Sequence, residues 1–284
     1  MKNFLFWFAA IVITLSAVVY QRVTGPTNPK RVSFDFDGTS YKSKLTRSLE
    51  TTITLDEAKG DYLTLNKTSP MKIKVSPSNE NFKIDVMYRI YPGSDTLKAA
   101  EVVKESDGYI ILFPSQPPAG KIEYKVSIND SSNSKVLFDD TVRMRFKSPV
   151  PGYVLIPHIL LMFIGMLLSN YTGIIAFENR EKALRYAIYV MIAIGAGGLL
   201  LGPLVQKFAF GSFWTGWPFG EDLTDNKTLF IFIVWLTAWL LNRKKTRRIL
   251  LVLAAFLTLL VYSIPHSTGG SEYDHERGEV VSGR

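Results

Sequence analysis

The chain of 284 residues contains no cysteine and only three histidines. The lack of cysteine excludes disulfide bonds, thiolate metal sites, iron–sulfur clusters and covalently attached c-type haem. Any water-facing domain must therefore be held together by its own hydrophobic core. Charged residues are also scarce in the apolar runs, where an ion or proton pathway would need them. No acidic or basic residue lies near the middle of the long apolar runs, which argues against an ion pathway or proton relay through this chain alone.

The distribution of apolar residues divides the chain into parts suited to lipid and a part suited to water. They make up 47% of the sequence, and the mean hydropathy is +0.11. Residues 4–20 and most of 153–264 are apolar, whereas residues 21–150 alternate between polar and apolar positions like a soluble domain. We therefore expect an uncleaved signal anchor at 1–21, a β-sandwich domain at 22–150, a transmembrane bundle at 151–265 and a flexible tail at 266–284.

The bundle is predicted to contain four helices that cross the membrane after the first anchor. Pro157 suits the first turn of the first of them, because a proline there loses no intrahelical hydrogen bond. Gly198 and Gly202 have the small-residue spacing that lets a neighbouring helix approach closely. The expected spans are 157–177, 186–205, 228–241 and 249–264.

The basic residues predict which way these helices run. They concentrate in the short loops 178–185 and 243–248, whereas the loop between the second and third of these spans carries only Lys207 and Lys227. By the positive-inside rule, the two basic loops and the N-terminus are cytoplasmic. The chain is then a multi-pass protein of the inner or plasma membrane, with the β domain, the loop 206–227 and the tail outside. The net charge of +8 is explained by this topology, and the dispersed basic residues of the β domain give no support for nucleic-acid binding.

The segment 22–150 has the pattern of an all-β domain. Short alternating runs are separated by turn residues such as Lys59-Gly60 and Pro92-Gly93, which is typical of an immunoglobulin-like or fibronectin-III-like β-sandwich. Tyr124 is expected to form a tyrosine corner at the start of a late strand.

One motif in this domain suggests an enzyme. Residues 35–39, Asp-Phe-Asp-Gly-Thr, resemble the aspartate-nucleophile signature of haloacid-dehalogenase-type phosphatases. That chemistry requires a strand, a loop and a following helix, and here more strand follows. We interpret Asp37-Gly38 as a hairpin turn instead.

The predicted topology gathers several polar residues at the outer membrane face. His158 and His266 lie in matching Ile-Pro-His tripeptides, and the loop before residue 228 supplies Glu221, Asp222 and Asp225. Imidazoles supported by carboxylates are the usual ligands of metals and of haem. The hypothesis is a divalent metal or b-type haem held by His158 and His266, with Asp222 and Asp225 as further metal ligands.

Two other interpretations of this face stay open. The histidines can satisfy backbone groups at helix ends, with Trp214 and Trp217 in an interfacial aromatic belt and Asp225 or Asn226 capping a helix. Alternatively, Trp214, Trp217 and Glu221 form a docking surface for another membrane subunit.

The sequence contains no nucleophile paired with a base and no phosphate-binding loop, so an enzyme is not expected. The leading hypothesis is a non-catalytic scaffold or accessory subunit, surrounded by membrane lipids, whose β-sandwich binds another membrane or extracytoplasmic protein in an envelope or respiratory assembly. The alternative is a redox or metal-binding membrane subunit that uses His158 and His266.

Overall fold

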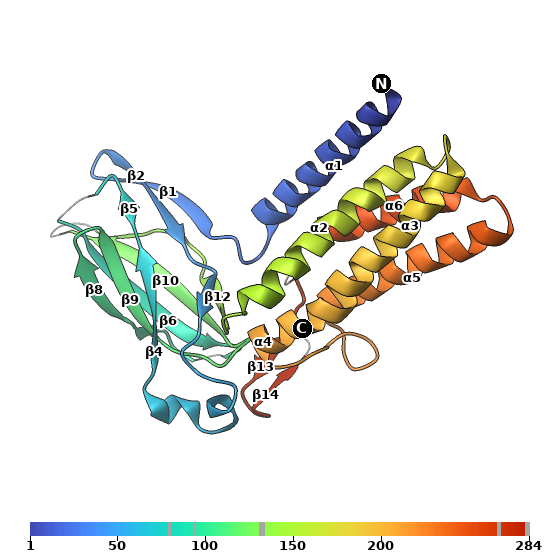
Figure 1. Cartoon of the computed structure of the whole chain (residues 1–284). Coiled ribbons are helices and arrows are strands. Elements are labelled where there is room, and N and C mark those ends of the chain that lie inside the picture. The colour runs from blue at the N-terminus through green and yellow to red at the C-terminus, as the bar shows by residue number, and fades with distance from the viewer. Residues whose placement is uncertain (79–80, 94, 131–133, 266–267, 282–284) are drawn as a thin grey trace. The chain divides into compact units, whose positions relative to one another are not determined.

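The structure is a computed structural model of the whole chain, and it describes all residues except 79–80, 94, 131–133, 266–267 and 282–284. It divides into two compact units (Figure 1). The helical unit comprises residues 1–26 and 150–271. The β unit comprises residues 27–149 and, from the end of the chain, residues 272–281.

Three helices of the helical unit are long and apolar enough to cross a membrane. They are α1 (Lys2–Thr24), α2 (Gly152–Ile175) and a continuous helix over Arg180–Phe210. The continuous helix consists of α3 (Arg180–Ile194), a π-helical segment η3 (Gly195–Leu201) and α4 (Gly202–Phe210). Two further helices follow, α5 (Leu223–Lys244) and the shorter apolar helix α6 (Arg248–Ser263).

Several helix boundaries differ from the expected ones, and the continuous helix Arg180–Phe210 extends beyond the expected span of 186–205 at both ends. Helix α2 begins at Gly152, directly after Pro151, so Pro157 lies inside the helix and not in its first turn. Helix α5 has 22 residues, because it begins before the apolar run and continues into the basic residues that follow it. The helix is therefore eight residues longer than the expected span of 228–241.

Helix α1 is an integral part of the helical unit. Trp7 stacks on Tyr171 of α2, with ring centroids 3.9 Å apart and an interplanar angle of 12°. Ala10 is fully buried, and one turn further along the Asn170 side-chain amide donates to Thr14 Oγ1 at 3.0 Å. Stacked rings and a buried polar pair both hold α1 against α2 in the structure.

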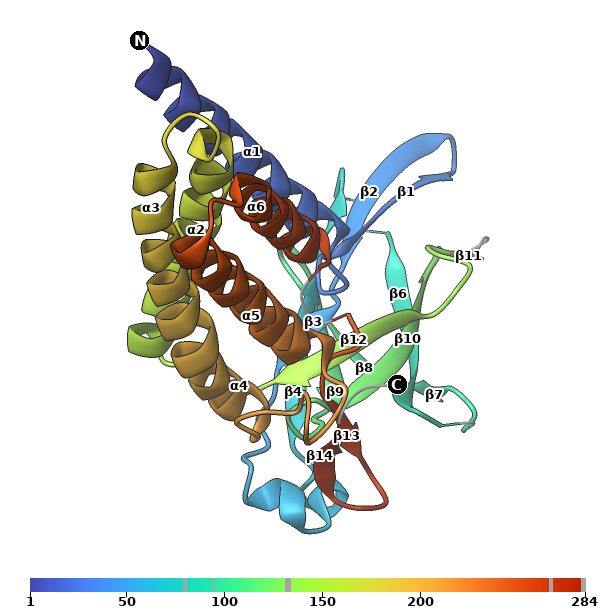
Figure 2. The same ribbon diagram turned by 90° about the vertical axis from the view of Figure 1, so that its right-hand side faces the viewer.

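Apart from a two-stranded hairpin at its C-terminal end, the β unit is built from three mainly antiparallel sheets that share one hydrophobic core. β1 (Lys30–Phe36), β2 (Thr39–Leu45) and β5 (Val75–Ser76) form the first sheet; β4 (Thr68–Ile73), β9 (Gly108–Pro114) and β8 (Glu101–Glu105) form the second. The third contains β3 (Ser48–Glu50), β12 (Val142–Lys147), β10 (Lys121–Asn129), β6 (Lys83–Tyr91), β7 (Lys98–Ala99) and β11 (Ser134–Val136). Figure 2 shows β12, β10 and β6 as neighbours in this sheet.

Alternation of side chains along the strands creates that core. In β1 and β2 every second residue is buried, so Val32, Phe34 and Phe36 face the same interior as Tyr41 and Leu45. The two short helical turns η1 (Glu57–Lys59) and η2 (Tyr62–Leu65) connect β3 to β4. They lie at one end of the sheets, where the polar residues discussed below gather.

The phosphatase-like motif forms a hairpin turn, as expected. Phe36 pairs with Thr39 across the β1–β2 hairpin, which leaves Asp37 and Gly38 as its two-residue loop. Their φ angles are 50° and 73°, which are the left-handed values that a type I′ turn requires at both positions. Asp35 therefore lies in β1 and Asp37 in the turn between two strands, and the strand β2, not a helix, follows them.

Tyr124 does not form the predicted tyrosine corner. It is fully buried in β10, and its hydroxyl donates to the Thr46 carbonyl at 2.7 Å. Thr46 is distant in sequence, whereas a tyrosine corner bonds a residue a few positions upstream. The hydroxyl instead ties β10 to the connection between β2 and β3.

The end of the chain differs from the expected flexible tail. β13 (Glu272–Asp274) and β14 (Glu279–Val281) pair as an antiparallel hairpin, here called the C-terminal hairpin. Tyr273 is buried at 4% exposure, and its amide donates to the Ala119 carbonyl. Tyr273 holds the hairpin in place, and the mostly polar composition of the segment gave no sign of this.

Candidate functional site

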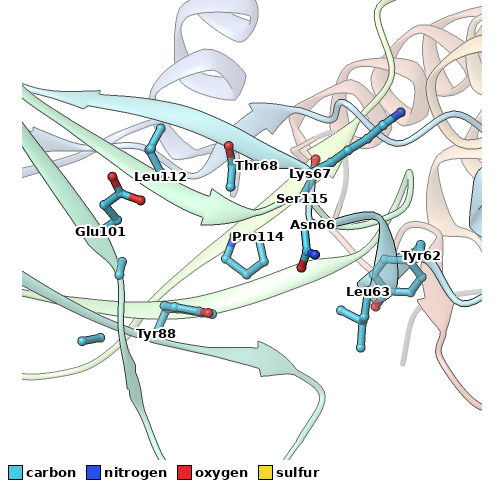
Figure 3. Close-up of a pocket in the computed structure, with 12 residues that line it drawn as sticks. Tyr62, Leu63, Asn66, Lys67, Thr68, Tyr88, Glu101, Leu112, Pro114 and Ser115 are labelled. Carbon is cyan, nitrogen blue, oxygen red and sulfur yellow. The ribbon is translucent and has the colours of Figure 1, made fainter.

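A pocket of about 220 Å³ opens at the end of the β unit where η2 meets the small sheet of β4, β9 and β8. Figure 3 shows Glu101 on one side of this pocket and Tyr62 with Leu63 on the other. The volume is below that of ordinary small-molecule sites, so it suits a single side chain. The lining residues are Tyr62, Leu63, Asn66, Lys67, Thr68, Tyr88, Ala99, Ala100, Glu101, Leu112, Pro114 and Ser115.

Buried hydroxyl groups fix the inner wall of the pocket. The Ser115 hydroxyl lies 2.6 Å from that of Ser69 and accepts from the amide and the hydroxyl of Thr52 at 3.0 and 2.9 Å. In the described chain, the bonds of Ser115 thus lead to hydroxyls and a backbone amide, not to a histidine or carboxylate base. Ser115 is a structural residue by this geometry, since a serine nucleophile needs an adjacent base.

The two charged residues of the pocket differ in how they are paired. Lys67 Nζ lies 2.6 Å from Glu57 Oε1. The hydrogen bond from Lys67, followed by that from the Thr54 amide, lowers the pKa of Glu57 to about 2, so the pair stays ionised at neutral pH. Glu101 is exposed and makes no ion pair with any described residue. The pocket therefore presents one uncommitted carboxylate beside apolar walls.

The C-terminal hairpin docks next to this pocket through Tyr62, which also lines it. The Tyr62 hydroxyl is 2.9 Å from His275 Nδ1, and the Tyr273 hydroxyl donates to the Ala58 carbonyl. Lys121 Nζ forms an ion pair with Glu272 at 2.6 Å, in which both side chains are mostly buried. A hollow of about 640 Å³ lies between the hairpin, the η1–η2 turn and the β6–β7 turn.

His275 is neutral in this environment. Burial lowers its pKa from the usual value, and the Tyr91 carbonyl and the carboxylates of Asp274 and Glu272 only partly oppose this effect. Burial also raises the pKa of Tyr62, so its hydroxyl stays protonated. The contact between the two is therefore a neutral hydrogen bond, which favours the docked hairpin near neutral pH.

His158 of the sequence hypothesis is bonded to the backbone and not to the predicted carboxylates. His158 Nδ1 lies 2.7 Å from the Gly197 carbonyl in the π-helical segment η3. His266 lies outside the described residues. In the described part of the chain, no group of three or more histidine, aspartate or glutamate residues could hold a metal ion.

Asp222 and Asp225 are instead occupied in holding the loop 211–222. Asp222 caps α5 by accepting from the Thr224 amide at 2.8 Å, a role that was expected of Asp225 or Asn226. Its other oxygen accepts from the amide of Ser271 at 3.0 Å. Asp225 accepts from the backbone amides of Thr215 and Gly216 at 2.7 and 3.1 Å. Each carboxylate is therefore surrounded by protein donors.

The proposed partner residues of this loop differ in how exposed they are. The Trp214 indole nitrogen donates to the Trp217 carbonyl at 3.0 Å, so the Trp214 ring braces the loop. Trp217 is 68% exposed, and Glu221 is also exposed. Trp217 and Glu221 are therefore exposed on this loop, whereas Trp214 is partly buried.

Several site residues were not found from the sequence. Gln206 and Ser271 join the network around Thr215, and Tyr62 and Glu101 line the pocket of the β unit. These are single polar residues without a motif, and they meet only through tertiary structure. A polar glutamine near the end of a long apolar helix was the one available signal.

Comparison with protein-family models, with curated proteins and with solved structures found no match to this chain.

Proposed function

We propose that this chain is a non-catalytic accessory subunit of the inner or plasma membrane, whose β domain binds a partner protein outside the membrane in an envelope or respiratory assembly. The observation that carries the proposal is the pocket beside Glu101. Its size fits one side chain of a partner and not a whole substrate. Its hydroxyls are already bonded to each other, which favours a binding role over a catalytic one.

The finer architecture in this proposal combines the helices with the charge pattern. We infer an immunoglobulin-like or fibronectin-III-like sandwich between the first anchor and a four-helix transmembrane bundle. The loops 178–185 and 243–248 lie in the cytoplasm with the N-terminus, and the β domain and the C-terminal hairpin lie outside. The concentration of basic residues in those two loops supports this orientation.

The chemistry of the pocket indicates what part of a partner it accepts. Leu63, Leu112 and Pro114 provide apolar walls, Tyr88 provides an aromatic face, and Glu101 provides the charge. A lysine or arginine side chain matches all three, because its stem packs on apolar surface while its charged end meets the carboxylate.

Site-specific photo-crosslinking in cells tests the proposal. A photoreactive amino acid at Leu63, which is 51% exposed beside the pocket, should crosslink a partner that the same residue at Val136, 43% exposed on β11, does not. Glu101→Arg should abolish the crosslink, because it places like charge against a basic partner group. Equal yields from positions 63 and 136, or a yield unaffected by Glu101→Arg, would contradict binding through this pocket.

A second candidate function is a metal-binding or haem-binding subunit, which the bond between His158 and Gly197 favours. A ligand histidine usually donates its other ring N–H to a carbonyl, which leaves Nε2 for the metal. Purified protein would then show a Soret band or stoichiometric metal that His158→Ala removes. A colourless, metal-free protein would exclude this function.

A further inference from the structure

The loop 211–222, between α4 and α5, exposes three large aromatic side chains. Phe213 is 54% exposed, Trp217 is 68% exposed and Phe219 is 83% exposed. In the described chain, no other connection between elements exposes three large apolar residues. A set of this kind on a loop indicates a surface that is covered by something else.

The loop is held in one conformation by hydrogen bonds from its backbone amides to side chains of α5. In addition to the amides bound by Asp225, the Trp217 amide donates to Asn226 Oδ1 at 2.6 Å. Gly216 packs so tightly that a Cβ atom there would lie 2.6 Å from the Asp225 Cβ. The aromatic side chains therefore project from a fixed backbone, and little conformational entropy is lost when they are covered.

The length of the preceding helix gives the depth of the loop. The stretch of helix from Arg185 to Lys207 has no charged residue between its ends. At about 1.5 Å per residue it is roughly 33 Å long. The hydrocarbon core of a bilayer is about 30 Å thick. If Arg185 lies at one boundary of the core, Lys207 lies at the other, and the loop that begins four residues later lies in the headgroup layer.

The contacts of Lys207 also indicate that it lies at the boundary between the hydrocarbon core and the headgroups. Its ammonium donates to the Gly211 carbonyl at 2.7 Å and lies 5.3 Å from the centre of the Phe213 ring. A lysine near a helix end extends its charge toward the lipid headgroups. The ring and the ammonium together match the apolar and the phosphate-bearing parts of a phospholipid.

We propose that the loop 211–222 is a rigid interfacial anchor, in which Phe213, Trp217 and Phe219 insert between the headgroups of the phospholipid bilayer that the helix Arg180–Phe210 spans. Aromatic side chains are enriched at this depth in membrane proteins. The hydrogen bonds of Asp222, Asp225 and Asn226 hold the loop and so set the depth at which the three rings meet the lipid. This proposal does not depend on the pocket of the β unit.

Depth-dependent fluorescence quenching tests the anchor. Because the chain has no cysteine, Phe219→Cys gives a single labelling site for an environment-sensitive nitrobenzoxadiazole probe on the full chain. The protein is reconstituted in vesicles of phosphatidylcholine and phosphatidylglycerol. Lipids with a spin label near the headgroup should quench the probe several-fold more than they quench a probe at Val136→Cys, which soluble iodide should quench instead. Phe213→Cys provides a second position with the same expectation.

Each other outcome overturns the proposal. A probe at 219 that is quenched by iodide and not by the lipid spin labels would place the loop in water. A probe that neither quencher reaches would show that protein covers the loop. The high exposure of Phe219 makes misfolding of the variant a poor explanation for either result, and a matching thermal unfolding curve for Phe219→Cys and the unmodified chain checks this directly.

Discussion

Acidification should release the C-terminal hairpin from the β unit. Histidine has a usual pKa of about 6.5, and burial lowers that of His275 in the docked hairpin. A detached hairpin regains the usual pKa, so as the pH falls the detached state takes up the proton first. Docking is therefore fully stable above about pH 6.5 and is weakened as the pH falls toward the lower pKa of the docked state.

The size of the effect follows from the same linkage. Between the two pKa values, each pH unit changes the docking free energy by at most about 1.4 kcal/mol, which is a tenfold change in the detached fraction. The His275 ring is only partly buried and lies near Glu272 and Asp274, so screening and attraction reduce this limit. Between pH 7.5 and 5.5 we therefore expect the detached fraction to rise by less than about tenfold.

Hydrogen exchange measured by mass spectrometry can follow this release in the full chain. Amides of residues 272–281 should lose protection as the pH falls, after correction for the intrinsic exchange rate. His275→Gln is the matched control, because glutamine can still hydrogen-bond to Tyr62 but does not titrate. Protection that stays constant with pH, or that falls as steeply in His275→Gln, would refute the assignment of the transition to His275.

Three further substitutions test the structural assignments through stability. Tyr124→Phe leaves the buried Thr46 carbonyl without its donor and should lower the free energy of unfolding of the β unit by about 1–3 kcal/mol. Gly216→Ala forces a Cβ against Asp225 and should cost about 1–3 kcal/mol, measured as faster proteolysis of the loop 211–222. Glu123→Ala removes a buried carboxylate from two half-exposed arginines and should cost about 1–2 kcal/mol in denaturant unfolding.

Each of these variants has a control, which is the same kind of substitution at a position that lacks the contact. Tyr91→Phe removes a hydroxyl that has no hydrogen bond in the described chain. Gly60→Ala adds a Cβ whose nearest neighbour is 3.8 Å away. Glu50→Ala removes an exposed carboxylate. Each should change stability by less than about 0.5 kcal/mol. A loss in a control equal to that in its test variant would contradict the assigned contact.

Local signals in the sequence predicted the parts of the fold that local chemistry determines. Asp37-Gly38 identified a hairpin because few other residue pairs tolerate two positive φ angles in succession. The C-terminal hairpin was missed for the opposite reason. Its strands have three residues each, and Tyr273 is anchored by Ala58 and Ala119, which are remote in sequence.

The candidate sites show the same limit. The sequence placed Asp222, Asp225 and Trp217 close together, but it did not predict the role of the two carboxylates. Carboxylates near histidines suggest metal ligands, and only the structure shows the hydrogen-bond donors around them. The amides of Thr215 and Gly216 that bind Asp225 carry no signal in the sequence. Glu101 is a candidate binding residue because the other charged residue of the pocket, Lys67, is already paired with Glu57. That pairing is known only from the folded chain.

The packing of α1 against α2 has a consequence for biosynthesis. Roughly 130 residues separate the two helices, and ribosomes add about 5–20 residues per second. In a chain inserted during translation, α1 is therefore in the bilayer for on the order of ten seconds before α2 is synthesised. During that time the Thr14 hydroxyl is satisfied within its own helix by the Ala10 carbonyl at 2.7 Å, and it can still accept from Asn170 afterwards. The Thr14 hydroxyl therefore has a hydrogen-bond acceptor before α2 is made as well as after it.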